Sequence, residues 1–149
     1  MTAKRMLPPT YLLLSIAAMA ALHMLLPLRA VIVFPWRLLG VLPLVLGLAL
    51  NLMADREFRQ HETTVRPFER STAMITSGVY RVGRNPMYLG FVLILLGVAI
   101  FLGSFSPFVV ILLFAVLMDV GFIRVEERMM AVEYGEAWLA YKTKVRRWL

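Results

Sequence analysis

A basic segment rich in turn-forming residues, at positions 78–90, has the residue types that could hold a polar cofactor beside a membrane. Tyr80, Arg84, Asn85 and Tyr88 supply aromatic faces, guanidinium and amide donors, and acceptors. The apolar run 91–102 follows directly, so these groups lie where a helix would leave the membrane. Asn before Pro is a helix-start signal, because Asn can cap free backbone N–H groups and Pro needs no donor in the first turn. The segment favours chemistry between a polar cofactor and a hydrophobic substrate.

A second polar cluster, Glu126-Glu127 with Arg124 and Arg128, follows the last apolar run. Only residues 103–107 separate the apolar runs 87–102 and 108–123, which predicts an antiparallel hairpin. The hairpin would place Tyr88 beside the start of this cluster. Taken alone, the arginines would be lipid anchors and the glutamates a solvated helix face. Because the two clusters converge at one mouth of the membrane, the sequence favours a functional site there.

The composition excludes several classes of protein and site. Sixty per cent of the residues are hydrophobic and the mean hydropathy is +0.76, which indicates a membrane protein. The absence of cysteine excludes disulfides, thiolate zinc sites and cysteine nucleophiles. The net charge is +7, and the basic residues flank the apolar runs. This pattern indicates contact with anionic lipid, with no nucleic-acid partner. We see no credible hydrolase triad, P-loop, dinucleotide fingerprint or metal-ligand set.

The apolar runs predict an all-α integral membrane protein with four transmembrane helices in a single domain, residues 1–149. We place the spans at about 11–28, 38–54, 87–102 and 108–123. A cleaved signal peptide is the weaker interpretation of the first run, because three more apolar runs follow. The site would form from a cytoplasmic loop, residues 55–86, and from residues 124–149, a C-terminal amphipathic helix with apolar residues at three- and four-residue steps.

The distribution of basic residues predicts the orientation. Four spans put fourteen lysines and arginines on one side, against Arg29 and Arg37 on the other. The positive-inside rule then places both termini in the cytoplasm. We expect the protein to lie in a cell inner membrane.

Three features leave alternatives open. Asn51 either makes a helix-to-helix hydrogen bond or takes part in the site. Asp119 either faces the same cavity as Glu126, seven residues on, or pairs with an arginine near the cytoplasmic face. Two glycine pairs, each seven residues apart, predict faces on the second and third spans that allow close helix packing: Gly40 with Gly47, and Gly90 with Gly97.

The motifs of the two polar clusters resemble the isoprenylcysteine carboxyl methyltransferase and phospholipid methyltransferase superfamily of integral-membrane enzymes. The resemblance covers roughly residues 50–149. Its four motifs are Gly78-Val79-Tyr80-Arg81, Arg84-Asn85-Pro86-Met87-Tyr88-Leu89-Gly90, the pair Glu126-Glu127, and Tyr134-Gly135-Glu136-Ala137-Trp138-Leu139-Ala140-Tyr141.

The resemblance implies S-adenosylmethionine as the cofactor. It implies backbone contacts from four residues, a pocket lined by five more, and Glu126 as an acidic contact for the cofactor's positive charge. The four are Thr72, Ala73, Met74 and Ile75, and the five are Tyr80, Asn85, Pro86, Met87 and Tyr88. We expect Arg84 and Glu127 to be catalytic. An amine or hydroxyl acceptor would need a base, for which Glu127 and Asp119 are the candidates.

Two departures from the family pattern bear on the methyl acceptor. Asn85 stands where the family has histidine, which removes a base at that position. Phe122 stands where the isoprenylcysteine enzymes have arginine, which argues against a prenylcysteine carboxylate. We therefore expect another lipophilic molecule or membrane lipid as substrate, entering from the bilayer.

Two other functions compete with methyl transfer. One is a nicotinamide-dependent membrane reductase, because sterol reductases share a similar C-terminal helical arrangement. The other is a non-catalytic membrane partner protein. Retention of S-adenosylmethionine instead of NADPH would favour the transferase, and a folded protein that binds neither would favour the partner protein.

Overall fold

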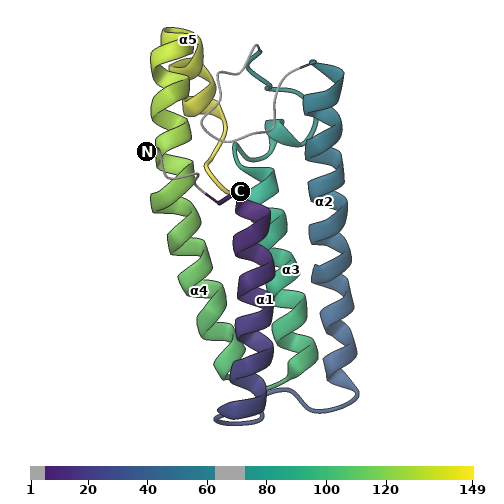
Figure 1. Ribbon diagram of the computed structural model, residues 1–149. Coiled ribbons are helices and arrows are strands. Elements are labelled where there is room, and N and C mark those ends of the chain that lie inside the picture. The colour runs from purple at the N-terminus through teal and green to yellow at the C-terminus, as the bar shows by residue number, and fades with distance from the viewer. Residues whose placement is uncertain (1–5, 63–72) are drawn as a thin grey trace.

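The computed structural model describes residues 6–62 and 73–149, and the regular structure in these two ranges is helical, without strands (Figure 1). Four helices run alongside one another: α1 (Pro8–Leu25), α2 (Val41–Gln60), α3 (Pro86–Leu102) and α4 (Ser106–Met118). A 3₁₀ turn, η1 (Trp36–Gly40), precedes α2. The all-helical prediction is confirmed.

The helix bounds differ slightly from the predicted spans. The first helix begins before residue 11 and ends three residues before 28, because Pro8 suits a first turn and Pro27 follows its end. Within the described ranges, three helical stretches are long and apolar enough to cross a membrane: Pro8–Leu25, Trp36–Gln60 and Ser106–Lys144. The apolar helix α3 is shorter, with 17 residues.

Helix α3 lies at the centre of the bundle and is the most thoroughly buried of the four. It packs against α1, α2 and α4, and Figure 1 shows it between α2 and α4. Leu95 on α3, Met19 on α1 and Phe114 on α4 form a core with less than 3% of each residue exposed. The outward sides of α1, α2 and α4 instead expose large apolar residues, as lipid contact requires.

The α2–α3 contact is made by the two predicted glycine pairs, in antiparallel order. A Cβ on Gly47 would lie 2.5 Å from the carbonyl oxygen of Gly90, and one on Gly40 would lie 2.5 Å from that of Gly97. Only glycine allows the backbones to approach so closely. Asn51 packs in the same seam, where a Cβ on Gly90 would meet its amide, and donates a hydrogen bond to Gly47 O (2.9 Å). The helix-to-helix hydrogen bond, one of the two roles left open for Asn51, is therefore not made to any described residue.

The turn between α3 and α4 closes the end of the bundle opposite α5. Gly103 takes a left-handed conformation (φ 78°) that ends α3, and its carbonyl accepts hydrogen bonds from the backbone of Val31 and Ile32. Ser104 Oγ lies 2.7 Å from His23 Nδ1. These contacts tie the α1–α2 connection to the hairpin turn.

The junction after α4 differs from a straight helix. A π turn, η3 (Asp119–Ile123), joins α4 to α5 (Arg124–Lys144). The π turn accommodates one residue more than an α turn, so it shifts the side chains beyond it by one position around the axis. The expectation that Asp119 shares a face with Glu126 is therefore wrong: Glu127 takes that place.

Helix α5 is bent at Gly135, whose dihedral angles (φ 50°, ψ −120°) are not helical. Its second arm turns back toward the bundle, and residues 145–149 run down beside the loop before α3 (Figure 1). Gly83 and Arg146 form an isolated parallel bridge there. The predicted C-terminal amphipathic helix is thus two helical arms with an extended tail.

Candidate functional site

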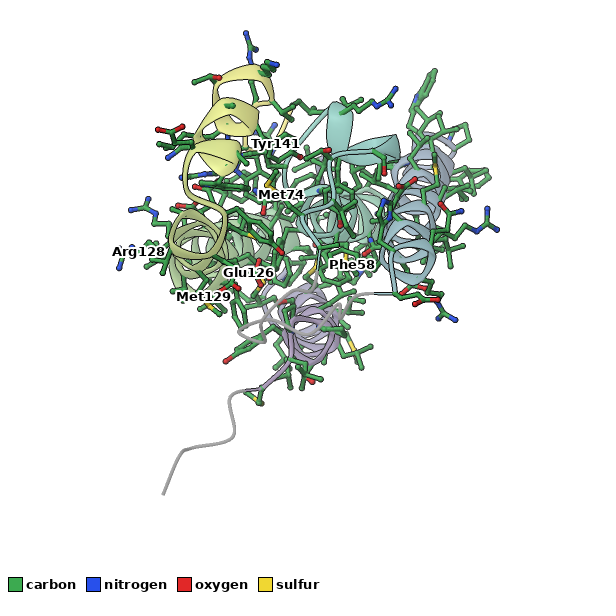
Figure 2. The ribbon with its side chains drawn as sticks, turned by 90° about the horizontal axis from the view of Figure 1, so that it is seen from above. Phe58, Met74, Glu126, Arg128, Met129 and Tyr141 are labelled. Atoms are coloured by element: carbon green, nitrogen blue, oxygen red, sulfur yellow. The ribbon has the colours of Figure 1, made fainter. Side chains whose placement is uncertain are left out.

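The polar end of the bundle is where residues 73–85, α5 and the tail cover the ends of α2 and α3, seen from above in Figure 2. A 3₁₀ turn, η2 (Gly78–Arg81), positions Tyr80. Gly78 has φ 54° and lies directly against the Glu57 carboxylate, which also accepts a hydrogen bond from Ser77 Oγ. A Cβ on Gly78 would meet only the end of the flexible Glu57 side chain, so the left-handed backbone conformation is what favours glycine at this turn.

Tyr80 and the residues before it lie between α2 and the second arm of α5. Ile75 and Tyr80 pack with Ala54, whereas Met74 packs on the opposite side against Trp138 and Tyr141. Among the described residues, the backbone groups of Met74 and Ile75 make no hydrogen bond. The backbone contacts to a cofactor that we expect from this segment stay a prediction. Thr72 lies outside the described residues.

Tyr141 connects the second arm of α5 to this turn. Its hydroxyl donates a hydrogen bond to Tyr80 O (2.6 Å). Burial raises the pKa of Tyr141 to about 12, against the opposing effect of the Arg84 charge, so the phenol stays protonated and keeps its donor. The Tyr80 ring itself packs edge-on against Phe58 at a centroid distance of 5.7 Å.

Tyr88 and Glu126 meet at the mouth of the bundle, as the hairpin predicts. Tyr88 Oη donates to Glu126 Oε1 at 2.8 Å, and the Phe91 and Phe122 rings lie 6.4 Å from the Tyr88 ring. Glu126 is partly buried and has no ion pair within the described part of the chain. Burial raises the pKa of the Glu126 carboxyl, and the hydrogen bond from Tyr88 offsets part of that rise.

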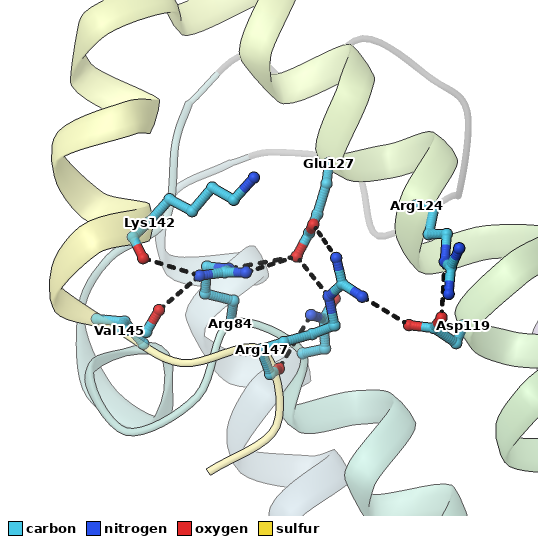
Figure 3. A network of polar contacts seen from close by, with 8 residues as sticks. Arg84, Asp119, Arg124, Glu127, Lys142, Val145 and Arg147 are labelled. Carbon is cyan, nitrogen blue, oxygen red and sulfur yellow. Dashed lines mark hydrogen bonds and ion pairs between the residues drawn. The ribbon is translucent and has the colours of Figure 1, made fainter.

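Glu127, the next residue, is surrounded by arginines. Its carboxylate accepts hydrogen bonds from Arg84 Nη2 (2.9 Å) and Arg147 Nη2 (2.8 Å), and Arg147 bridges onward to Asp119 (3.0 Å) (Figure 3). Arg124 completes the network with a 2.7 Å contact to Asp119. Burial alone would raise the pKa of Glu127, but the hydrogen bonds from Arg147 and Arg84 outweigh it and hold the pKa below its usual value. Of the two alternatives for Asp119, pairing with arginine is confirmed.

Arg84 and Asn85 hold the C-terminal tail. Arg84 Nη1 donates to the carbonyls of Lys142 (3.0 Å) and Val145 (2.6 Å), and its guanidinium lies 5.8 Å from the centre of the Trp138 ring. Asn85 Nδ2 donates to Arg147 O (3.0 Å). Helix α3 begins after Asn85 as predicted, but Asn85 makes no side-chain cap hydrogen bond, because its amide is directed to the tail.

The predicted site residues thus fall into two sets. Glu126 and Tyr88 belong to an inner set with Tyr80, Ile75 and Met87, whereas Arg84, Asn85 and Glu127 belong to the tail network. Pro86 is buried and is the first residue of α3. Ala73 is the first described residue of the loop that precedes it. Sequence reasoning missed Arg147 because it lies past the periodic part of the tail. The spacing of Trp138 and Tyr141 did signal a packed face.

Comparison with known proteins gives one match. A family model described as phospholipid methyltransferase matches residues 36–137. No curated protein and no solved structure matches the chain. The matched range contains every predicted site residue, from Thr72 to Glu127.

Proposed function

The chain belongs to the phospholipid methyltransferase family, and we propose that it transfers a methyl group from S-adenosylmethionine to a lipophilic acceptor at the cytoplasmic face of a cell inner membrane. The family makes the protein a membrane methyltransferase, and this favours methyl transfer over the nicotinamide-dependent reductase. The methyl donor, the acceptor and the orientation are our proposal.

One observation supports a cationic cofactor at the mouth of the bundle: among the residues that the structure describes, the partly buried Glu126 has no cationic partner, while Glu127 beside it has two. An unpaired buried carboxylate is costly and favours any ligand that supplies positive charge. S-adenosylmethionine, when bound, supplies an electrophilic methyl group on a positively charged sulfonium and also carries an ammonium. The donor set at the mouth therefore fits this cofactor.

The chain's own residues would bind and orient the cofactor and acceptor while keeping water out. Tyr88 holds the Glu126 carboxylate in place through its 2.8 Å hydrogen bond. The Tyr80 and Tyr88 rings are each 7% exposed and help to form the apolar wall of this mouth, at which the Tyr88 hydroxyl reaches Glu126. The unpaired backbone groups of Met74 and Ile75 offer further contacts. Such a site accelerates methyl transfer mainly by alignment of the two reactants and by exclusion of water.

Arg84 and Glu127 would serve the reaction by fixing the C-terminal arm over the site. Both side chains are almost fully enclosed, with 6% and 9% of their surfaces exposed, and they pair with each other. A direct part for Glu127 as a base would require its carboxylate to leave Arg84 and Arg147. Its lowered pKa also makes it a weaker base.

The acceptor would be a membrane lipid such as a phospholipid headgroup amine, in place of a prenylcysteine carboxylate. Phe122 is 4% exposed, and its ring packs against the rings of Tyr11 and Tyr88. An apolar wall at this position offers no partner to an acceptor carboxylate, whereas an arginine would. The outward apolar surfaces of α1 and α2 suit lateral entry from the bilayer.

The experiment is calorimetric titration of S-adenosylmethionine into the purified protein and two charge-matched variants. Glu126→Gln should weaken binding about ten- to a hundredfold, the worth of a charge-assisted contact of about 1.5–3 kcal/mol. Glu136→Gln changes an exposed glutamate on the second arm and should bind normally. Labelled methyl should then pass into a total lipid extract. Binding of NADPH alone, or equal affinity in both variants, would overturn the proposal.

A further inference from the structure

We propose that a basic groove on the Glu127 side of α5 binds the phosphate of an anionic lipid, apart from the proposed methyl-transfer site. The groove has a volume of about 290 Å³ and lies between the two arms of α5. Its charged lining is Arg124, Arg128, Lys142 and Arg147, with one carboxylate, Glu127. Four cations against one anion make the groove a favourable position for a negatively charged ligand.

Two of these cations have no partner of their own. Glu127 is already satisfied by Arg84 and Arg147, and Arg124 is paired with Asp119. The side chains of Arg128 and Lys142 make neither a hydrogen bond nor an ion pair with any described residue, and both residues are exposed. Figure 2 shows Arg128 at the outer edge of the protein, and Figure 3 shows Lys142 extending from the second arm toward the Glu127 side of the groove. Charge in this groove is therefore left uncompensated.

The surface below the groove favours a lipid over a free anion. The outer side of α4 exposes Leu113 (65%) and Val116 (62%), and η3 after it exposes Val120 (54%); Arg124 follows within the next turn. An acyl chain lying along this apolar surface would bring its headgroup phosphate level with the basic side chains. Basic residues at the end of an apolar helix are typical of anionic-lipid contact. Trp138, only 5% exposed, gives the groove a rigid wall.

The groove and the inner set take ligands of opposite charge. Glu126 faces Tyr88 inside the bundle, and the cations of the groove lie on the other side of the same helix. Lipid binding in the groove requires no methyl transfer. It can therefore be measured without S-adenosylmethionine, and its failure would leave the proposed reaction untouched.

The test is native mass spectrometry of the full chain in neutral detergent, with three probes offered separately. These are phosphatidylglycerol, phosphatidylcholine with the same acyl chains, and inorganic phosphate. We expect phosphatidylglycerol to bind at least about tenfold more tightly than either of the others. The double variant Arg128→Ala/Lys142→Ala should lose about a hundredfold in affinity, tenfold for each charged contact. Lys142→Arg, which keeps the charge, should retain binding.

The matched control is Arg56→Ala/Lys144→Ala, which removes two exposed cations outside the groove. It should bind phosphatidylglycerol normally. An equal loss in both double variants would show diffuse attraction to a basic surface and would overturn the site. Inorganic phosphate bound as tightly as the lipid would overturn the lipid assignment, and phosphatidylcholine bound equally would overturn the requirement for an anion.

Discussion

Glu126 and Glu127 are adjacent in the chain but have opposite electrostatic surroundings. The Glu126 carboxylate accepts a hydrogen bond from the Tyr88 hydroxyl and has a raised pKa. The Glu127 carboxylate lies between two arginines and has a lowered pKa. Titratable groups whose environments move their pKa values apart serve different purposes. Among the described residues, the Glu126 carboxylate has no ion pair, whereas two arginines hold the Glu127 carboxylate.

Cofactor affinity should depend on pH through Glu126. Because burial raises its pKa, Glu126 becomes protonated at a higher pH than an ordinary glutamate and then loses its attraction for a cation. We expect S-adenosylmethionine affinity to be constant above this pKa and to fall as the pH decreases through it. Calorimetric titrations at a series of pH values measure the effect.

The Glu126→Gln variant is the control for this pH dependence. It should bind weakly with a much flatter profile, while Glu136→Gln should keep the slope of the unaltered protein. A slope that persists in Glu126→Gln would mean that another group titrates.

At this scale, sequence reasoning succeeds where chain geometry restricts the outcome. A hairpin with a very short turn leaves Tyr88 little choice but to lie near residues 123–126, and the structure brings Tyr88 and Glu126 together. It fails where two partners compete for one side chain. Asn85 is a residue type that favours helix caps, but its side-chain amide donates a hydrogen bond to the Arg147 carbonyl instead. The two residues are 62 positions apart, so no local sequence pattern signals that contact.

The α2–α3 pair is the element contact with the least tolerance for change. A Cβ at Gly47 would lie 2.5 Å from Gly90 O and 2.9 Å from the Ile94 backbone nitrogen. Backbone atoms cannot rotate away as a side chain can, so a larger residue must separate the helices. Packing in a membrane relies on such small residues.

Gly47→Ala should lower the thermal unfolding temperature in detergent, whereas Gly121→Ala should leave it nearly unchanged. A Cβ on Gly121 would meet only a Leu117 methyl group at 4.0 Å. Both changes add one methyl group and reduce backbone freedom equally, so their difference isolates the close contact. Unfolding temperatures lowered equally in both variants would contradict the contact.

The arm after Gly135 depends on the Glu127 network. Glu127→Gln leaves Arg84 enclosed with one charge uncompensated, which should cost about 3–5 kcal/mol. We expect hydrogen exchange to increase at residues 136–149. Glu136→Gln is the control.

The stabilisation from Glu127 also depends on pH. Because the pKa of Glu127 is lowered, its contribution to the stability of the fold is present above the pKa of an unfolded glutamate and is lost only as the pH falls through the lowered value. Unchanged exchange in Glu127→Gln would contradict this role.

Across the whole molecule, apolar exposure and charge are separated along the bundle axis. Large exposed apolar residues lie on α1, α2 and α4, while the arginine network and the candidate site lie at one end (Figure 1). The prediction of four spans places Ser104, at the hairpin turn, and the C-terminus on opposite sides of the membrane.

Reporter fusions test this topology. An insertion at Ser104 should be active only outside the cytoplasm, and a C-terminal fusion only inside it, as the positive-inside rule predicts. Insertion after Glu62, in the loop that we predict to be cytoplasmic, should match the C-terminal fusion. Reporters at Ser104 and the C-terminus that respond alike would contradict four spans.

Helix positions and their packing were predictable because long apolar runs and glycine spacing are strong signals. The bend at Gly135 was not, because the apolar stripe continues through it from Tyr134 to Trp138 as in a straight helix. The π turn was also missed, since residues 119–123 have no composition that distinguishes them from an α-helical stretch.

The π turn links the backbone conformation of residues 119–123 to the surroundings of both glutamates. Its extra residue aligns Glu127 with Asp119 and turns Glu126 inward. If the chain kept its length and this turn became an ordinary α turn, the side chains beyond it would rotate and Glu126 would take the place of Glu127, although neither had been mutated. Deleting one residue from 119–123 would instead bring Glu127 to the seventh position after Asp119, where an α-helix already aligns the two. A relative without the extra residue would therefore keep each glutamate in its present surroundings.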